Sequence, residues 1–252
     1  MKIGIIGAGP IGTALTRQYA KAGHDVKLAN ASGIKKLKQL AEETGAKAVT
    51  LAEVIVDIEV LVVAIPLIEV PKLSKSIGLI TSNTIIIDTT NYYPIRDGQI
   101  DEIENGMPES VWVSNQLQQP VVKVYNSIIA GSLIQSGLPK GSASRTALPI
   151  SGDDQRSKSL VSTLVNDSGF DALDIGNLKE SWRQQPGSPV YCTDLNLQQL
   201  KKNSTIANRE LLAARRELSL QFILKKNPEQ WMDWWKDCVI NNRSINESDL
   251  SA

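Results

Sequence analysis

The sequence predicts an α/β protein: a doubly wound, mostly parallel sheet followed by a C-terminal helical extension. Short apolar, β-branched runs alternate with helical patterns over roughly the first 90 residues, which is typical of parallel strands covered by helices. The last 70 residues or so read instead as a loop and then helices. We therefore expect two parts, a sheet domain at residues 1–180 and an extension at residues 181–252.

The elements of the sheet domain follow one another at short spacing. Strands are expected at residues 2–6, 25–29, 46–49, 59–65 and 84–88, with later strands at 121–126, 146–151 and 172–175. Between the early strands lie helical patterns that end at Gly23 and Gly45, since glycine favours helix ends. Residues 92–120 are polar and predict a connection with one helix. Asp153 and Asp154 are expected to cap the helix that follows them.

The extension is expected to begin with a loop at residues 182–189. A long helix over residues 195–224 follows, is broken at Asn227-Pro228, and gives way to a last helix ending near Val239. Residues 246–252 are expected to fray. An amphipathic tail of this kind predicts a packed cap or a homodimer contact, with a lid over a ligand as the alternative.

Composition excludes several classes of function. The chain has 27 basic and 27 acidic side chains and a net charge of zero, whereas nucleic acids and acidic membrane surfaces attract a basic excess. No run approaches the roughly 20 apolar residues of a membrane span. Cys192 and Cys238 form no C-x-x-C pair and are expected to be reduced thiols, so we expect a cytoplasmic protein without a nucleic-acid or membrane partner.

The strongest motif is Gly7-Ala8-Gly9-Pro10-Ile11-Gly12, between an apolar strand and an amphipathic helix. In that context G-x-G-x-x-G indicates a Rossmann-like dinucleotide site. The first glycine allows a tight turn, the second lets the backbone approach the diphosphate, and the third lets the helix pack on the strand. Proline suits the first helical turn, and the amides of Ile11 and Gly12 would then face the phosphates.

The end of the second strand favours NADP(H) over NAD(H). An NAD site places Asp or Glu about 20 residues after the glycines, but this chain has Asn30, Ala31 and Ser32 there. Asn30 and Ser32 can donate hydrogen bonds, and Lys35 and Lys36 add positive charge that would attract a 2′-phosphate. Alternatively, the two lysines are an ordinary solvated surface.

Two further strand ends are expected to contact the dinucleotide, because open parallel sheets bind ligands at the carboxyl ends of their strands. Ala64, Ile65 and Pro66 end the fourth strand and are expected near the adenosine or a ribose. Thr89 and Asn91 end the fifth strand and are expected near the nicotinamide ribose. Each also has an ordinary role in a turn.

No acid–base residue stands out, and no cluster of metal ligands is evident. His24, the one histidine, lies at the opposite edge of the sheet from the motif. Alcohol oxidation needs a group to take a proton, whereas hydride transfer to a flavin-like ring depends mainly on stacking and orientation. The alternatives are a 3-hydroxy acid dehydrogenase or imine reductase that uses Lys201 or Lys202, and a protein that senses NADP(H) without turnover.

Several segments together resemble the NADP oxidoreductases that depend on a deazaflavin coenzyme. They are residues 1–12, Gly23-His24-Asp25-Val26, residues 28–30, 64–66, 123–128 and 149–154, and Asp174-Ile175-Gly176-Asn177-Leu178. The cytosolic domain of the six-transmembrane ferric reductases is similar too. The resemblance implies NADP(H) at the glycine loop, with Asn126, Ser127 and Ile128 near the nicotinamide.

The same resemblance implies a second substrate, a deazaflavin or flavin-like ring whose pocket Leu178 and Trp182 border. The chain departs from the family at Ala31-Ser32, where a Ser-Arg pair is common and the arginine holds the 2′-phosphate. The C-terminal tail is also longer than in the deazaflavin enzymes, so the acceptor could be a flavin, a quinone or another small molecule.

Overall fold

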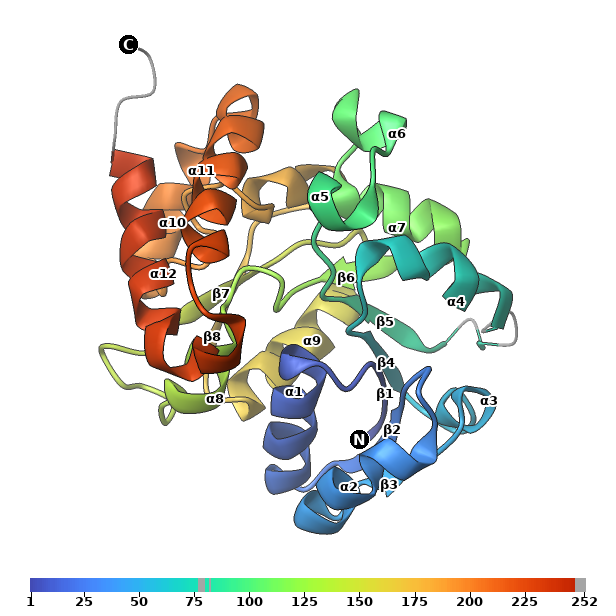
Figure 1. The fold of residues 1–252 in the computed structure, drawn as a ribbon. Helices are drawn as coiled ribbons and strands as arrows, with labels where there is room; N and C mark the ends of the chain where they lie inside the picture. Colours follow the sequence, from blue (N-terminus) through green and yellow to red (C-terminus); the bar gives the residue numbers. More distant parts are fainter. Residues whose placement is uncertain (77–79, 82, 248–252) are drawn as a thin grey trace.

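The computed structural model describes residues 1–76, 80–81 and 83–247, and its centre is a six-stranded parallel sheet (Figure 1). The strand order is β3-β2-β1-β4-β5-β6, as expected for a doubly wound Rossmann-like sheet. The strands are β1 (Lys2–Ile6), β2 (Asp25–Ala29), β3 (Lys47–Ala48), β4 (Val60–Val63), β5 (Ile85–Asp88) and β6 (Val121–Lys123). The predicted fold class is therefore confirmed.

The register of the central strands creates the crevice expected of this topology. From β1 the chain moves to β2 and β3 on one side, and then crosses to β4 on the other. Ile6 pairs with both Ala29 and Val63, so the carboxyl ends of β1, β2 and β4 lie level with one another. The strand order reverses between β1 and β4, and the residues after those strands face the switch point.

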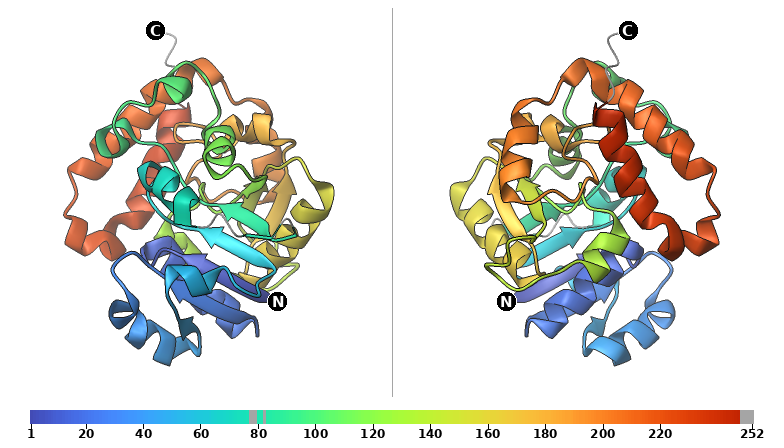
Figure 2. Two further views of the ribbon diagram at one scale, coloured as in Figure 1. Left: turned by 90° about the vertical axis from the view of Figure 1, so that its right-hand side faces the viewer. Right: turned by 90° about the vertical axis from the view of Figure 1, so that its left-hand side faces the viewer.

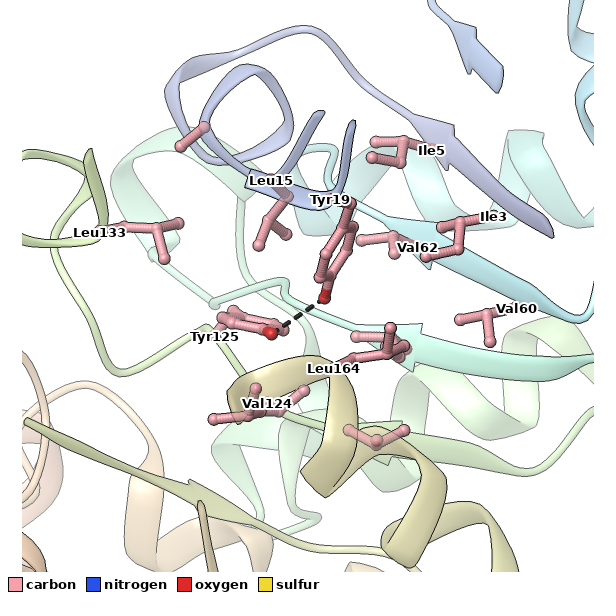
Figure 3. Close-up of a cluster of buried hydrophobic side chains, with 14 of the residues drawn as sticks. Ile3, Ile5, Leu15, Tyr19, Val60, Val62, Val124, Tyr125, Leu133 and Leu164 are labelled. Atoms are coloured by element: carbon pink, nitrogen blue, oxygen red, sulfur yellow. Dashed lines mark hydrogen bonds between the residues drawn. The ribbon is translucent and has the colours of Figure 1, made fainter. Parts of the chain in front are cut away.

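Helices cover both faces of the sheet, and each layer buries an apolar cluster. On one face α1 (Pro10–Lys21) and α9 (Gln155–Asp167) pack against the strands through Leu15, Tyr19 and Leu164 (Figure 3). On the other face α3 (Leu51–Val54), α4 (Val70–Ser76) and α7 (Glu109–Leu117) contribute Val54, Val70 and Trp112. Burial on both faces explains the apolar composition of the strands.

A second, two-stranded parallel sheet lies next to the end of β6. It pairs β7 (Ala147–Ile150) with β8 (Asp171–Asp174), and an antiparallel bridge between Lys123 and Ser151 links it to β6. The strand expected at residues 121–126 ends at Lys123. Tyr125, which adopts the left-handed conformation with φ of 62°, turns the chain there.

Several expected boundaries were wrong because caps and turns divide the chain more finely than periodicity shows. Residues 92–120 hold α5 (Pro94–Asp97), α6 (Asp101–Glu104) and α7, not one helix. The helical pattern that ends at Gly45 is two elements, η1 (Ile34–Leu37) and then α2 (Lys38–Thr44). The loop expected at 182–189 starts inside η3 (Leu178–Gln184).

The long helix expected at residues 195–224 is three elements. These are α10 (Leu197–Thr205), capped by Asn196, then η4 (Arg209–Leu211), capped by Asn208, and α11 (Leu212–Leu224). After η5 (Pro228–Gln230), α12 (Trp231–Glu247) runs eight residues past the expected end at Val239. Asn246, expected to fray, lies in α12, and residues 248–252 lie outside the described part.

The C-terminal helices α11 and α12 form a hairpin along one side of the sheet domain (Figures 1 and 2). Trp235 of α12 packs on Gly131 of α8 (Ala130–Gln135), where an added Cβ would lie 2.3 Å from the indole ring. Leu218, Leu224 and Ile240 are exposed on the hairpin, and the homodimer contact remains a prediction. Within residues 1–76, 80–81 and 83–247, no helix has the length and apolarity to span a membrane.

Candidate active site

The glycine motif forms a tight turn between β1 and α1. Gly7 has a φ of 113°, and a Cβ there would lie 2.0 Å from the carbonyl oxygen of Ala64. A Cβ on Gly12 would lie 1.9 Å from the carbonyl oxygen of Gly7. Both glycines are therefore required by the fold itself, because α1 and the turn after β4 approach the backbone too closely for any side chain.

Gly9 differs from its neighbours because a Cβ there would meet nothing within 4 Å. Its backbone is extended, with φ of −72° and ψ of −176°, so no conformational reason requires glycine. Pro10 takes the first helical position, and Thr13 donates the first amide bond of the helix to Gly9, at 2.9 Å. The amides of Ile11 and Gly12 precede that bond and are placed to bind an anion.

The end of β2 carries the residues expected at the adenosine ribose. Asn30 has a buried Oδ1 atom without a hydrogen-bond partner among the described residues. Ala31, Ser32 and Lys35 are exposed beside it, on a turn at Gly33 with φ of 84°. An unpartnered amide oxygen next to an open, cationic turn fits a ribose hydroxyl and a 2′-phosphate, and no carboxylate stands there to repel the phosphate.

The ends of β4 and β5 lie beside the glycine turn. Ala64 donates its amide to Ile6 at 2.8 Å, which fixes the turn next to β1, and Ile65 and Pro66 remain partly exposed beyond it. The Thr89 hydroxyl donates to the Val63 carbonyl at 3.1 Å, so its bonding within the protein is structural. The structure thus brings the residues after β1, β4 and β5 to one edge.

Asn91, Asn126 and Gln184 form a buried amide network at the far end of that edge. Asn91 donates to the Asn126 carbonyl at 2.9 Å, and Asn126 donates to the Asn91 side chain at 3.1 Å. Gln184 donates to Oδ1 of Asn126 at 2.8 Å and accepts from it through its carbonyl at 2.7 Å. The network holds the loops after β5 and β6 against η3.

Ser127 and Ile128 follow Asn126 and face different surroundings. Ser127 has a buried hydroxyl oxygen without a partner in the described part of the chain, so it can take a ligand hydrogen bond. Ile128 is 3% exposed and belongs to the apolar cluster under α1 and α9. Its side chain therefore supports the loop from behind.

Leu178 and Trp182 lie on η3. Leu178 is buried in the apolar cluster that includes Trp112 of α7. Trp182 is half-buried, and the guanidinium groups of Arg183 and Arg209 lie 4.4 Å and 5.7 Å from its ring centroid. Trp182 thus offers a cation-stacked aromatic surface near the amide network, whereas Leu178 mainly secures η3 to α7.

A pair of tyrosines at this edge was missed by the sequence reasoning. The hydroxyl groups of Tyr93 and Tyr191 lie 2.6 Å apart, although 98 residues separate them in the chain. Tyr93 follows Asn91 by two residues, so its place just after the fifth strand was a usable signal. Tyr191 gave no such signal, because only the packing of the extension brings it there.

A buried ion pair lies beneath the same loops. Lys123 and Asp88 are fully buried, with Nζ and Oδ2 3.1 Å apart, and the Ser110 hydroxyl donates to the same oxygen at 2.6 Å. Lys123 also donates to the Thr90 carbonyl. These bonds satisfy the two charges and fix the ends of β5 and β6 relative to each other.

Glu109, at the start of α7, is the other buried acid of this region. It is 1% exposed, and burial raises the pKa of its carboxyl to about 7. The positive charge of Lys123 and hydrogen bonding from Gln185 and the Tyr92 amide oppose that shift. A carboxyl with such a pKa can hold or release a proton near neutral pH.

His24 lies at the opposite edge of the sheet from the glycine motif, and the two lysines of the alternative prediction lie on the surface. His24 bonds the chain's first amino group and Asp167, each at 3.1 Å, at the amino ends of the strands. Lys201 and Lys202 are exposed on α10. In the part of the chain that the structure describes, His, Cys, Asp and Glu side chains form no group of three or more that could hold a metal ion.

Comparison with known proteins agrees with this geometry. The family described as coenzyme F420-dependent NADP oxidoreductase matches residues 2–92. The Escherichia coli K12 protein YjhV is 38% identical over 111 residues, which are 43% of this chain and 77% of that protein. The sequence match thus covers the glycine turn, the end of β2 and the ends of β4 and β5.

Two solved structures extend the similarity beyond the sequence match. The hypothetical protein SMa0349 from Sinorhizobium meliloti superposes with a TM-score of 0.69 and 25% identity, over 78% of this chain and 95% of that one. An Arthrobacter sp. FB24 protein with the provisional name F420-dependent NADP reductase gives a TM-score of 0.58 and 20% identity, over 72% and 87%. The second likeness is one of fold.

Proposed function

The chain belongs to the family of NADP oxidoreductases dependent on coenzyme F420, and from that premise we propose that it transfers a hydride between NADP(H) and a small acceptor, in the first place a deazaflavin or flavin-like ring. The observation that carries this proposal is the space at Gly9, open at the sheet's switch point and faced by the free amides of Ile11 and Gly12.

The residues at the carboxyl edge have distinct roles in this proposal. The nicotinamide supplies the hydride, and the chain supplies position and a dry surrounding. Asn91 and Asn126 hold the loop on which Ser127 lies, and the unpartnered Ser127 hydroxyl can orient a carboxamide. Trp182 offers a flat surface for the acceptor ring.

Preference for NADP(H) is proposed to come from Asn30, Ser32 and Lys35. We expect a lower Kd for NADPH than for NADH, measured by fluorescence titration. Replacing Ser32 and Lys35 together by Ala is expected to weaken NADPH binding about tenfold, since an exposed charge and one hydrogen bond contribute about 1.4 kcal/mol together. NADH should be unaffected. Lys21→Ala, an exposed lysine at the opposite end of α1, is the matched control.

Turnover is tested by mixing the protein with NADPH and a panel of acceptors: a deazaflavin, FMN, FAD and quinones. Acceptor-dependent loss of the reduced nicotinamide absorbance supports the proposal. Tight NADPH binding without turnover for any acceptor would favour a sensor of NADP(H) instead.

The tyrosine pair favours a second candidate, reduction of a carbonyl or imine as in 3-hydroxy acid dehydrogenases and imine reductases. That chemistry needs a proton donor beside the hydride site, and the hydroxyl groups of Tyr93 and Tyr191 are candidates for it. Adding a small aldehyde and a cyclic imine to the panel separates the two candidates, because the preferred acceptor identifies the reaction.

A further inference from the structure

We propose that Tyr93 donates a proton to the acceptor as the hydride arrives, and that Tyr191 and Glu109 resupply that proton. This inference rests on the proposed hydride transfer and names the groups that would complete it. It implies an acceptor that takes a hydride on one atom and a proton on a nitrogen or oxygen conjugated with it.

The backbone places both tyrosines at the nicotinamide end of the site. Tyr93 lies two residues after Asn91 in the segment that follows β5, and Asn91 is bonded to the loop of Asn126. On the other chain segment, the amide of Cys192 donates to the Ser127 carbonyl at 2.8 Å, so its neighbour Tyr191 is held beside the same loop. Tyr93 is half-buried whereas Tyr191 is buried, so Tyr93 is assigned as the donor.

Unpartnered polar atoms at this edge indicate that it can bind water or a ligand. One buried side-chain oxygen in each of Thr90, Glu109, Ser127 and Gln185 has no hydrogen-bond partner among the described residues; in Glu109 it is Oε2. All four lie on the loops after β5 and β6, at the start of α7 or just after η3. Buried polar atoms in proteins are usually satisfied, so this group points to water or a ligand along a polar path.

The carboxyl of Glu109 accepts hydrogen bonds from the Gln185 side chain and from the amide of Tyr92, the residue next to Tyr93. Burial raises the pKa of the Tyr93 and Tyr191 hydroxyl groups, and the negative charge of Glu109 adds a smaller contribution in the same direction. A phenol whose pKa is raised stays protonated until a strong base forms beside it. The groups facing Glu109 are Lys123 of β6, Arg216 of α11, the Gln185 side chain, the Tyr92 amide and the two tyrosines.

The proton balance of the reaction requires such a path. NADPH gives up a hydride, which carries two electrons, and becomes NADP⁺. The acceptor's π electrons move onto its nitrogen or oxygen, which takes the proton from the Tyr93 hydroxyl as that O–H bond breaks. Tyr191 passes its proton to Tyr93, Glu109 replaces it by way of water along the polar path, and solvent restores Glu109. One NADPH and one solvent proton are consumed per acceptor.

Removal of one hydroxyl tests the donor. With the best acceptor of the panel, Tyr93→Phe and Tyr191→Phe are expected to lower kcat about 100-fold, the lower range for general acid catalysis, while the Kd for NADPH stays unchanged. Tyr19→Phe is the matched control. The Tyr19 hydroxyl also belongs to a buried pair, 2.9 Å from the Tyr125 hydroxyl, but it lies in the apolar cluster under α1 and α9 (Figure 3). Unchanged kcat in Tyr93→Phe would overturn the proposal, and unchanged kcat in Tyr191→Phe would overturn the role of Tyr191.

The pH profile tests the supply of protons. Wild-type kcat is expected to fall as pH rises through about 7, because Glu109 then loses its proton. Glu109→Gln is expected to give a low and pH-independent kcat, with a reduced solvent deuterium isotope effect. A profile in Glu109→Gln that matches wild type overturns the role of Glu109. Failure of wild type to oxidise NADPH with every acceptor would instead refute the proposed function and this inference together.

Discussion

Two alanine substitutions in the glycine motif should affect different properties, although both add one methyl group. Gly9→Ala should weaken binding of the dinucleotide, whereas Gly12→Ala should destabilise the fold. A Cβ on Gly9 enters open space, whereas a Cβ on Gly12 would lie 1.9 Å from the Gly7 carbonyl oxygen, far inside the 3.4 Å of ordinary contact. Gly9→Ala is therefore a change at the binding surface, and Gly12→Ala is a change in the fold.

The magnitudes follow from those positions. At Gly9, loss of a favourable helix cap costs a few tenths of a kcal/mol and the stiffer unfolded chain returns a similar amount, so Tm should move by about 2 °C or less. Gly12→Ala should cost about 3 kcal/mol, or about 6 to 12 °C in Tm, because α1 must move away from the turn.

Among folded protein, the Kd for NADPH should rise more in Gly9→Ala than in Gly12→Ala. If the Gly9 methyl keeps the diphosphate from the amides of Ile11 and Gly12, two charge-assisted hydrogen bonds are lost, which is about 3 kcal/mol and a Kd for NADPH about 100-fold higher. Thermal unfolding and a fluorescence titration with NADPH measure the two effects. Gly9→Ala protein with wild-type Tm and wild-type Kd would refute the reasoning.

Three further predictions concern other parts of the molecule. Asn30→Asp should raise the Kd for NADPH about tenfold and lower that for NADH, because a carboxylate repels the 2′-phosphate and accepts from the ribose; equal shifts in a titration would contradict this. The pKa of Glu109 is raised from 4.5 to about 7 in the folded chain, so the native state holds the proton more tightly than the unfolded chain. The free energy of unfolding in urea should therefore fall by about 3 kcal/mol as the pH rises from 4.5 to 7, and this fall should be absent in Glu109→Gln. Gly131→Ala should lower Tm through its clash with Trp235, and adding Trp235→Leu should restore part of the loss; a wild-type Tm in the single variant would argue against this packing.

The sequence was a good guide wherever the signal is local. The glycine turn is set by a strand, a helix and three glycines within a dozen residues. The structure shows the tight turn at Gly7, with φ of 113°, and the close packing at Gly12. The fold class followed too, because alternating strands and helices predict a parallel sheet covered by helices. Whether Asn30, Ser32 and Lys35 select NADP(H) stays a prediction.

The part of the site proposed to hold the nicotinamide was harder to predict because it is assembled from distant segments. Gln184 reaches Asn126 from 58 residues away, and Tyr191 meets Tyr93 from 98 residues away. Neither contact leaves a periodic pattern. The conclusion from sequence that no proton donor stands out came from looking for histidine and known motifs, whereas a buried tyrosine pair is created only by tertiary packing.

Helix boundaries in the extension failed for a different reason. Hydrophobic spacing continues across residues 195–224, but Asn196 and Asn208 cap new helical segments, and capping bonds can outweigh a continued period. The end of α12 was placed too early because its polar last turns are held by bonds such as Asn242 to the Tyr191 carbonyl, at 3.4 Å.

A crystal structure of the protein grown with NADPH would test the main claim most directly. The account predicts the diphosphate against Gly9, within hydrogen-bond distance of the Ile11 and Gly12 amides, and the nicotinamide beside Asn126 and Ser127. A dinucleotide bound elsewhere, or a switch point without one at saturating NADPH, would contradict it.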